Sequence, residues 1–183
     1  VDDDVFSESN LNRQLYSSEK NFEMSKVKAA ADRVALINNA VEVSSHMCRG
    51  DLNSLPDILN GCDVVLDCLD NLPSRYDLEK VCSQLKVIMV HGAIAGFLGQ
   101  LAVIRPDRPL LSTIYGPSDK VKSDKGIEVE LGNPAFTPSM LASWQVGETV
   151  KILAGLGSVL PADKMLILDM QSGESYQVGL SAH

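Results

Sequence analysis

A short apolar run about a third of the way along the chain constrains the fold more than any other feature. Residues 62–68 are almost continuously apolar and are followed closely by the polar pair Asp70 and Asn71. Apolar side chains on both faces are typical of a strand buried in a parallel sheet. A helical pattern at 72–85 and a second apolar run at 87–90 come next. This alternation predicts an α/β fold with a Rossmann-like, doubly wound and mostly parallel sheet.

The residues before this run predict helical structure and one short strand. Ser25 is a candidate helix cap, and apolar residues recur at helical spacing from 27 to 37, so we expect a helix with one buried face. We expect a short strand at 41–43 and a short helix at 51–59.

The residues after the run predict an antiparallel C-terminal extension of the sheet. A glycine turn leads into a strand at 100–104 without an intervening helix. Thr137 and Pro138 have the residue types of a helix cap and a first helical position. We expect the last strands, at 165–169 and 176–178, to pair as a closing hairpin.

Length and charge place the chain in an ordinary class of globular proteins. Its 183 residues, 45% of them apolar, are enough for one domain with a sizeable core. Four of the eight prolines fall in residues 105–135, which predicts a long mobile loop. The net charge of −8 argues against nonspecific binding to nucleic acid or an anionic membrane. Neither a membrane span nor a secretory signal is evident, so we expect a cytoplasmic protein.

The four cysteines indicate structural rather than metal-binding roles. Cys48, Cys62, Cys68 and Cys82 form no Cys-x-x-Cys pair, the usual signal for a zinc ribbon or a redox site. We expect them to be reduced and mostly to be small core residues.

The most specific segment lies at the N-terminus. Residues 2–14 read Asp-Asp-Asp-Val-Phe-Ser-Glu-Ser-Asn-Leu-Asn-Arg-Gln, Lys26 follows, and 66–71 read Leu-Asp-Cys-Leu-Asp-Asn. The chain resembles the ThiF/MoeB/HesA family of adenylating enzymes, relatives of the ubiquitin-activating enzymes, whose hallmark combines these stretches. The resemblance covers nearly the whole chain, including Gly-Asn-Pro at 132–134 and a Glu-x-x-Lys pair at 148–151.

The chemistry of this family explains the residue types. Carboxylate activation by ATP brings a polyphosphate beside a second anion, so the site must supply positive charge. Arg13 offers a planar fork for phosphate oxygens, Lys26 a point charge, and Asn10 and Gln14 neutral donors. The resemblance assigns these four to triphosphate binding, and Arg13 and Lys26 to electrostatic catalysis. Taken alone, the two cations are typical of solvated ion pairs, but their spacing with Asp70 favours a site.

The resemblance also assigns the acidic residues. Asp70 follows the carboxyl end of a buried strand, where α/β sheets bind ligands, and is implied to hold Mg²⁺ and to be catalytic. Asp2 is similar to the acidic residue that binds the ribose hydroxyls of a nucleotide. Asp4 and Asn71 complete the implied nucleotide-binding set.

Three further polar residues leave alternatives open. Asp67 either serves the site or accepts hydrogen bonds from the adjacent turn. Arg75 either reaches a partner protein or pairs with Asp70 or Asp77. His91, at a strand end, is either catalytic or structural, and the absence of a Ser or Cys motif beside it favours a structural role.

Some family features lie outside this sequence or are replaced. The first strand and the glycine-rich phosphate loop would precede Val1, so we expect 1–183 to be one adenylation domain lacking them. Residues 109–113 read Pro-Leu-Leu-Ser-Thr where many relatives carry the first zinc-binding cysteine pair, so we expect no zinc site. No cysteine follows Cys82, which puts a covalent transfer step in doubt.

The resemblance implies an ATP- and Mg²⁺-dependent adenylyltransferase. Its substrate would be the C-terminal glycine carboxylate of a small ubiquitin-like sulfur carrier ending in Gly-Gly, in thiamine, molybdopterin or related sulfur transfer. Residues 105–135 would cover the carrier tail. Relatives are usually homodimers in which the neighbour lends an arginine, and Trp144 would lie in the core or at that interface.

The alternatives are a tRNA-directed cyclodehydratase of the same superfamily and a non-catalytic partner subunit. The net charge argues against the first. The retained Arg13, Lys26 and Asp70 argue against the second, whereas the missing glycine-rich loop argues for it. An NAD-dependent dehydrogenase would share the sheet architecture but would not need the Asn-Leu-Asn-Arg-Gln segment.

Overall fold

A five-stranded mixed sheet forms the centre of the protein. The computed structural model describes residues 1–120 and 128–180. The strands lie in chain order across the sheet: β1 (Val64–Asp67), β2 (Ile88–Ala95), β3 (Leu98–Ile104), β4 (Lys164–Asp169) and β5 (Glu174–Gly179). The α/β class and the antiparallel extension are therefore confirmed. Among the described strands only the β1–β2 pair is parallel, so the antiparallel part is larger than the sequence indicates.

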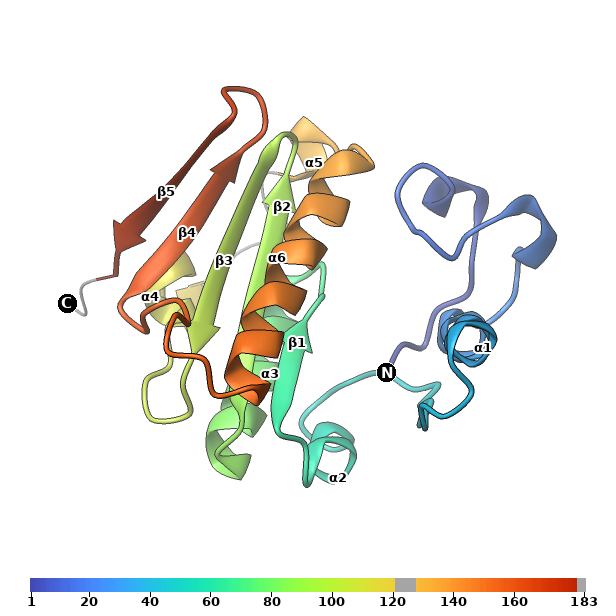
Figure 1. The fold of residues 1–183 in the computed structure, drawn as a ribbon, viewed down its shortest axis with the longest axis horizontal. Coiled ribbons are helices and arrows are strands. Elements are labelled where there is room, and N and C mark those ends of the chain that lie inside the picture. The colour runs from blue at the N-terminus through green and yellow to red at the C-terminus, as the bar shows by residue number, and fades with distance from the viewer. Residues whose placement is uncertain (121–127, 181–183) are drawn as a thin grey trace.

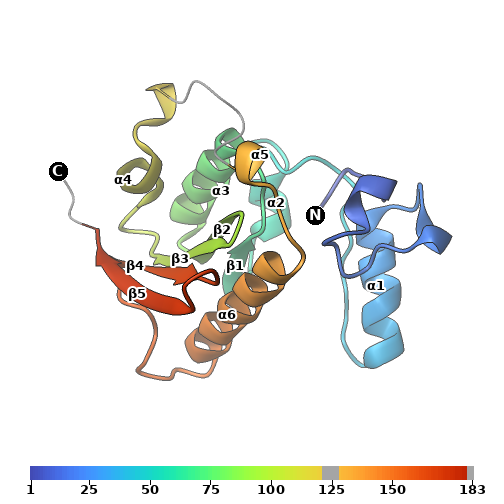
Figure 2. The ribbon, with the colours of Figure 1, turned by 90° about the horizontal axis from the view of Figure 1, so that it is seen from above.

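Helices cover both faces of the sheet. Figure 2 shows α3 (Leu72–Leu85) and α4 (Leu111–Tyr115) on one face and α6 (Phe136–Leu153) on the other. Successive side chains of a strand point to opposite faces, so Met89 joins the core beneath α3 while Val90 joins the core beneath α6. None of the helices in the described ranges is long and apolar enough to cross a membrane.

Local signals explain where the long helices begin and end. The side-chain oxygen of Asn71 accepts a hydrogen bond from the Ser74 amide at 2.9 Å, and α3 ends at Lys86, which adopts the left-handed conformation. The bounds of α3 are those predicted. Helix α6 begins at Phe136, and the prediction that Thr137 caps it is wrong. The Thr137 hydroxyl is buried and donates instead to the Gly96 carbonyl oxygen at 2.7 Å.

Residues 1–47 form a separate unit beyond the β1 edge of the sheet, as both views show (Figures 1 and 2). It contains the short helices η1 (Glu8–Asn10) and η2 (Glu19–Asn21) and the expected helix α1 (Lys26–Ile37), which Ser25 caps. The predicted buried face of α1 is wrong, because Ala29 is the one buried residue of this helix and Ile37 is 67% exposed.

The predicted strand at 41–43 is also wrong. These residues are exposed and belong to none of the strands in the described part of the chain. A strand requires a neighbour for its backbone hydrogen bonds, and the described elements offer none at this place.

The remaining elements are short. Helix α2 (Leu55–Leu59) is shorter than expected. The segment 105–135 contains α4, η3 (Ser118–Lys120) and α5 (Glu128–Leu131), while 121–127 lie outside the described residues. Its mobility stays a prediction.

Candidate functional site

Asp4 and Lys26 are held together at the start of α1. The backbone amide of Lys26 donates to the Asp4 carbonyl oxygen at 3.1 Å, and the Lys26 ammonium lies 2.5 Å from the Asp4 carboxylate. This hydrogen bond lowers the pKa of Asp4. The Lys26 side chain is only 15% exposed, so its ammonium has a defined position at the edge of the N-terminal unit.

Three of the predicted nucleotide-binding residues gather around one small pocket. Asp2, Gln14 and Lys26 line a cavity of about 390 Å³. Apolar side chains complete its lining: Val1, Phe6, Leu15, Tyr16, Val27 and Ala30. A mainly apolar pocket with a few polar groups is typical of a small-molecule site.

Arg13 and Asn10 belong to the turn that follows η1. The Arg13 guanidinium donates to the Ser9 carbonyl oxygen at 2.8 Å and to the Asn12 side-chain oxygen at 2.9 Å. Both acceptors are neutral, and no carboxylate among the described residues forms a salt bridge with Arg13. Its charge is therefore uncompensated, which suits a phosphate ligand. Asn10 is buried, and its oxygen accepts from the Ser7 amide, so it also shapes this turn.

Asp70 and Asn71 form a second group, in the loop between β1 and α3. Asp70 is exposed, and its carboxylate accepts a 3.3 Å hydrogen bond from the Asn71 amide. The described residues contain no cluster of three or more His, Cys, Asp or Glu side chains suited to a metal ion. A single free carboxylate still fits Mg²⁺, which keeps waters and takes its other ligands from phosphates. Asn71 uses its side-chain oxygen to cap α3.

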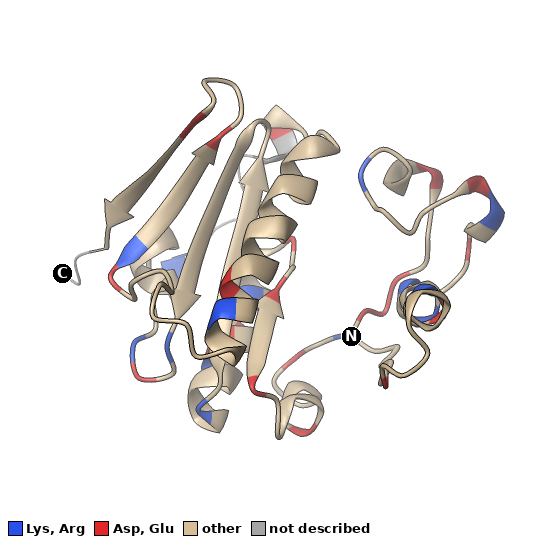
Figure 3. Cartoon of the chain, in the orientation of Figure 1, with Lys and Arg blue, Asp and Glu red and all other residues tan. Residues whose placement is uncertain are grey.

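The described side-chain contacts do not join Asp70 to Arg13 or Lys26. The N-terminal unit and the rest of the chain meet instead at Asn12, whose amide lies 3.4 Å from the Asn133 carbonyl oxygen. Figure 3 shows acidic and basic residues interspersed along the N-terminal unit.

A buried polar network behind the Asp70 loop contains the three residues for which the sequence left alternatives open. Asp67 is fully buried and accepts from the Leu69 amide at 3.0 Å, so it does shape the adjacent turn. His91 is fully buried, and its Nδ1 lies 2.6 Å from the Asp67 carboxylate, which is a structural contact. Arg75 donates to the Leu69 carbonyl oxygen, and its Nε lies 3.9 Å from the Asp67 carboxylate. The alternative that Arg75 pairs with Asp70 or Asp77 is therefore wrong, and its contact with a partner protein stays a prediction.

Residue patterns gave no signal for three members of this network: Gln100, Tyr115 and Gln145. Neutral polar residues occur throughout the sequence, and these three are distinguished only by their place in the fold: Gln145 is buried, and Gln100 and Tyr115 are half-buried. A buried amide needs hydrogen-bond partners, but sequence spacing does not reveal where those partners lie.

The expectation that the cysteines mostly lie in the core is wrong. Of the four cysteines, all free, only Cys82 is buried, while Cys48 is half-buried and Cys62 and Cys68 are exposed. Trp144 is 42% exposed on α6, so it does not belong to the core, and its place at an interface stays a prediction.

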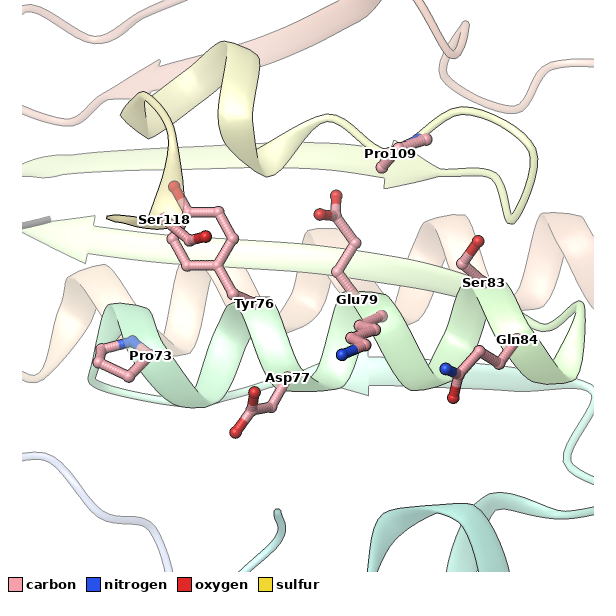
Figure 4. Close-up of a pocket in the computed structure, with 9 residues that line it drawn as sticks. Pro73, Tyr76, Asp77, Glu79, Ser83, Gln84, Pro109 and Ser118 are labelled. Carbon is pink, nitrogen blue, oxygen red and sulfur yellow. The ribbon is translucent and has the colours of Figure 1, made fainter. Parts of the chain in front are cut away.

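A larger groove, of about 600 Å³, lies along α3 and contains none of the predicted site residues (Figure 4). Its residues include Tyr76, Asp77 and Ser118. Glu79 also lines it, but the Glu79 carboxylate accepts from the Leu110 and Leu111 amides, at 2.7 and 2.9 Å. These contacts anchor the start of α4, so Glu79 has a structural partner already.

The fold and the two polar groups define an α/β protein with a small pocket, lined by Asp2, Gln14 and Lys26, in the unit beyond the β1 edge of a mixed sheet. The model of the ThiF family matches residues 1–182, and the chain belongs to this family.

The chain is similar to an activating enzyme and to an adenylyltransferase. It is 33% identical over 162 residues to the SAMP-activating enzyme E1 of Haloferax volcanii, covering 87% of this chain and 59% of that protein. It is 34% identical over 176 residues to the adenylyltransferase and sulfurtransferase MOCS3 of Drosophila yakuba, covering 94% of this chain and 38% of the relative. The chain thus spans well under two thirds of either relative's length.

A solved structure of E. coli MccB with ATP has the same fold, with a TM-score of 0.79 at 14% identity. The match covers 98% of this chain and 55% of MccB.

Proposed function

We propose that the protein is an ATP-dependent adenylyltransferase that activates the C-terminal glycine carboxylate of a small ubiquitin-like sulfur carrier ending in Gly-Gly. The gathering of Asp2, Gln14 and Lys26 around one pocket is the observation that carries the proposal. The names of its relatives, a SAMP-activating enzyme and an adenylyltransferase, support it. The solved structure of MccB with ATP also supports it, because MccB has the same fold.

The reaction would be a substitution at the α-phosphorus of ATP. A carrier carboxylate oxygen forms a bond to this phosphorus, and the bond to the bridging oxygen of pyrophosphate breaks. Negative charge then grows on the transferred phosphate and on the leaving pyrophosphate. Arg13, which has no carboxylate partner among the described residues, and Lys26 stabilise this charge electrostatically.

The remaining residues would bind and orient the reactants. Asp2 accepts hydrogen bonds from the ribose hydroxyls, Gln14 and Asn10 donate to phosphate oxygens, and Asp4 and Asn71 support this set. Asp70 holds Mg²⁺, which neutralises phosphate charge when it is bound. The exposed carboxylate of Asp70 meets this role without a cluster of protein ligands.

The proposal includes a homodimer in the cytoplasm. Helix α6 exposes apolar side chains, among them Trp144, Val150 and Leu153, that a second copy of the chain would cover. The four free cysteines agree with a reducing compartment. Sedimentation velocity of the full protein tests the dimer, which a purely monomeric sample at micromolar concentration would contradict.

Carrier-dependent exchange of pyrophosphate into ATP tests the activity. The full protein, an Arg13→Ala variant and an Arg33→Ala control are compared with candidate Gly-Gly carriers. Arg33 is also an arginine of the N-terminal unit and is exposed on α1. We expect Arg13→Ala to lose roughly 100-fold or more of the exchange rate, and Arg33→Ala to keep it.

Two results would contradict the proposal. Equal exchange in Arg13→Ala and the control would remove Arg13 from the mechanism. No exchange with any Gly-Gly carrier, in a folded protein that binds ATP, would favour an RNA-directed enzyme or a partner subunit.

A further inference from the structure

The carboxylate of Asp67 connects two parts of the protein. Asp67 and His91 are register partners in the parallel β1–β2 pair. One Asp67 oxygen accepts from the Leu69 amide, inside the loop that carries Asp70. The other lies 2.6 Å from His91 Nδ1. Asp67 therefore transmits the position of the His91 ring to the backbone just before Asp70.

The Tyr115 hydroxyl lies on the other side of the His91 ring, 3.0 Å from Nε2. Two side-chain donors approach the same hydroxyl: the Gln100 amide and, at 3.3 Å, the Arg75 guanidinium. A tyrosine hydroxyl has one proton and two acceptor positions. The two donors occupy the acceptor positions, so the hydroxyl proton is donated to His91 Nε2.

This arrangement sets the proton positions of the whole chain of hydrogen bonds. Because Nε2 accepts, the imidazole proton is on Nδ1 and is donated to Asp67. Burial of Tyr115, more than any other factor, raises its pKa to about 12, so its hydroxyl stays protonated and remains a donor. Water is excluded from His91 and Asp67, both of which have no exposed surface.

We propose that Tyr115 and His91 are positioning residues that hold the Asp70 loop in place from α4. The connection runs from the Tyr115 hydroxyl through His91 and Asp67 to the Leu69 amide. Arg75 forms a second connection between the same two places, since it donates both to the Tyr115 hydroxyl and to the Leu69 carbonyl oxygen. An effect on catalysis through the placement of Asp70 rests on the proposed function. The structural claim that these residues hold the loop in place does not depend on that function.

The loop contains its own reporter. Cys68 lies between Asp67 and Leu69, and it is exposed at the surface. A loop that is held less firmly opens more often, so loss of its hydrogen bonds increases the rate at which this thiol is alkylated.

Two other cysteines supply internal controls. Cys62 is exposed before β1 and reports the intrinsic rate of alkylation. Cys82 is 2% exposed in the core and reports global unfolding. Iodoacetamide labelling of the full protein, followed peptide by peptide with mass spectrometry, measures all three rates in one sample.

Two tyrosine variants distinguish the proposed connection from a general effect on α4. Tyr115→Phe removes the hydroxyl that donates to His91 and accepts from Gln100 and Arg75, and it leaves the ring in place. Tyr76→Phe is the matched control, because the Tyr76 hydroxyl donates to the Gly116 carbonyl oxygen, 2.6 Å away, and so holds the end of α4 without contacting His91. We expect Tyr115→Phe to raise the alkylation rate of Cys68 roughly 2- to 10-fold, which corresponds to the loss of one hydrogen bond. The alkylation rate of Cys68 in Tyr76→Phe should stay near that of the wild type.

Replacement of His91 gives a second test. His91→Asn places an amide donor near the position of Nδ1, so it restores the bond to Asp67, whereas His91→Ala does not. We expect Cys68 to be less reactive in His91→Asn than in His91→Ala.

The inference is overturned by equal Cys68 rates in Tyr115→Phe and Tyr76→Phe. It is also overturned if the alkylation rate of Cys82 rises in parallel with that of Cys68, because this would indicate global destabilisation. None of these rates depends on ATP or a carrier, so a failure of the proposed function is seen separately, in the exchange assay. Where exchange is present, we expect Tyr115→Phe to raise KM for Mg-ATP more than Tyr76→Phe does.

Discussion

Gly92 in β2 leaves space that the side chain of Gln145 occupies. A Cβ atom at position 92 would lie 2.6 to 2.9 Å from the Gln145 amide group. That amide is 4% exposed and donates to the carbonyl oxygens of Asp67 and Val90, at 2.9 and 3.1 Å. The backbone of Gly92 is not left-handed, so alanine is excluded by this contact and not by its own conformation.

Gly92→Ala should therefore lower the free energy of unfolding by displacing Gln145. Loss of two hydrogen bonds of a buried amide costs roughly 2–4 kcal/mol. Replacing a strand glycine with alanine returns roughly 0.5–1 kcal/mol through the unfolded chain. The expected net loss is about 1–3 kcal/mol, measured by urea unfolding with circular dichroism.

The sign should reverse once Gln145 is shortened. In a Gln145→Ala background the close contact is gone, so Gly92→Ala is expected to stabilise the protein by about 0.5–1 kcal/mol. The single and double variants together give the coupling free energy between the two positions. An equal loss of stability from Gly92→Ala in both backgrounds would refute the reasoning, because it would locate the conflict elsewhere.

Three further predictions concern charge. Glu79→Gln should lower the unfolding free energy by about 1–2 kcal/mol, because its hydrogen bonds to the start of α4 lose their charge; urea unfolding measures this, and an unchanged midpoint would contradict it. The raised pKa of Tyr115 means that its contribution to stability is complete below about pH 10 and is lost as the pH rises toward 12; thermal unfolding across this range should show a fall that Tyr115→Phe reduces. Lys26→Gln should raise the pKa of Asp4 toward its ordinary value, followed by NMR titration, and the stabilisation from this pair should disappear as the pH falls through the lowered pKa of Asp4; an unshifted titration would show that Lys26 is not its cause.

The fold was predictable from the sequence where its signals are local. Helix α3 has the predicted bounds because its cap, its proline and its left-handed end lie within the segment itself. The hairpin of β4 and β5 was predicted for the same reason. The strand at 41–43 and the buried face of α1 were wrong, because a strand or an apolar face needs a partner from elsewhere in the chain.

The candidate site was also predictable from the sequence only in part. Asp2, Gln14 and Lys26 were chosen from a motif, and the fold brings them around one pocket. The motif did not indicate that Asn71 is occupied as a helix cap, since the same amide serves a ligand or a backbone equally well.

The sequence by itself determined the chemical inventory of this protein: an α/β domain, two separated polar motifs, and the family to which they belong. Only the tertiary structure decided that Asp67 and His91 are neighbours and that Tyr115 joins them. The reason is physical. The register of β1 on β2 and the packing of α4 bring these side chains into hydrogen-bond range, and both are properties of the assembled core rather than of any one segment.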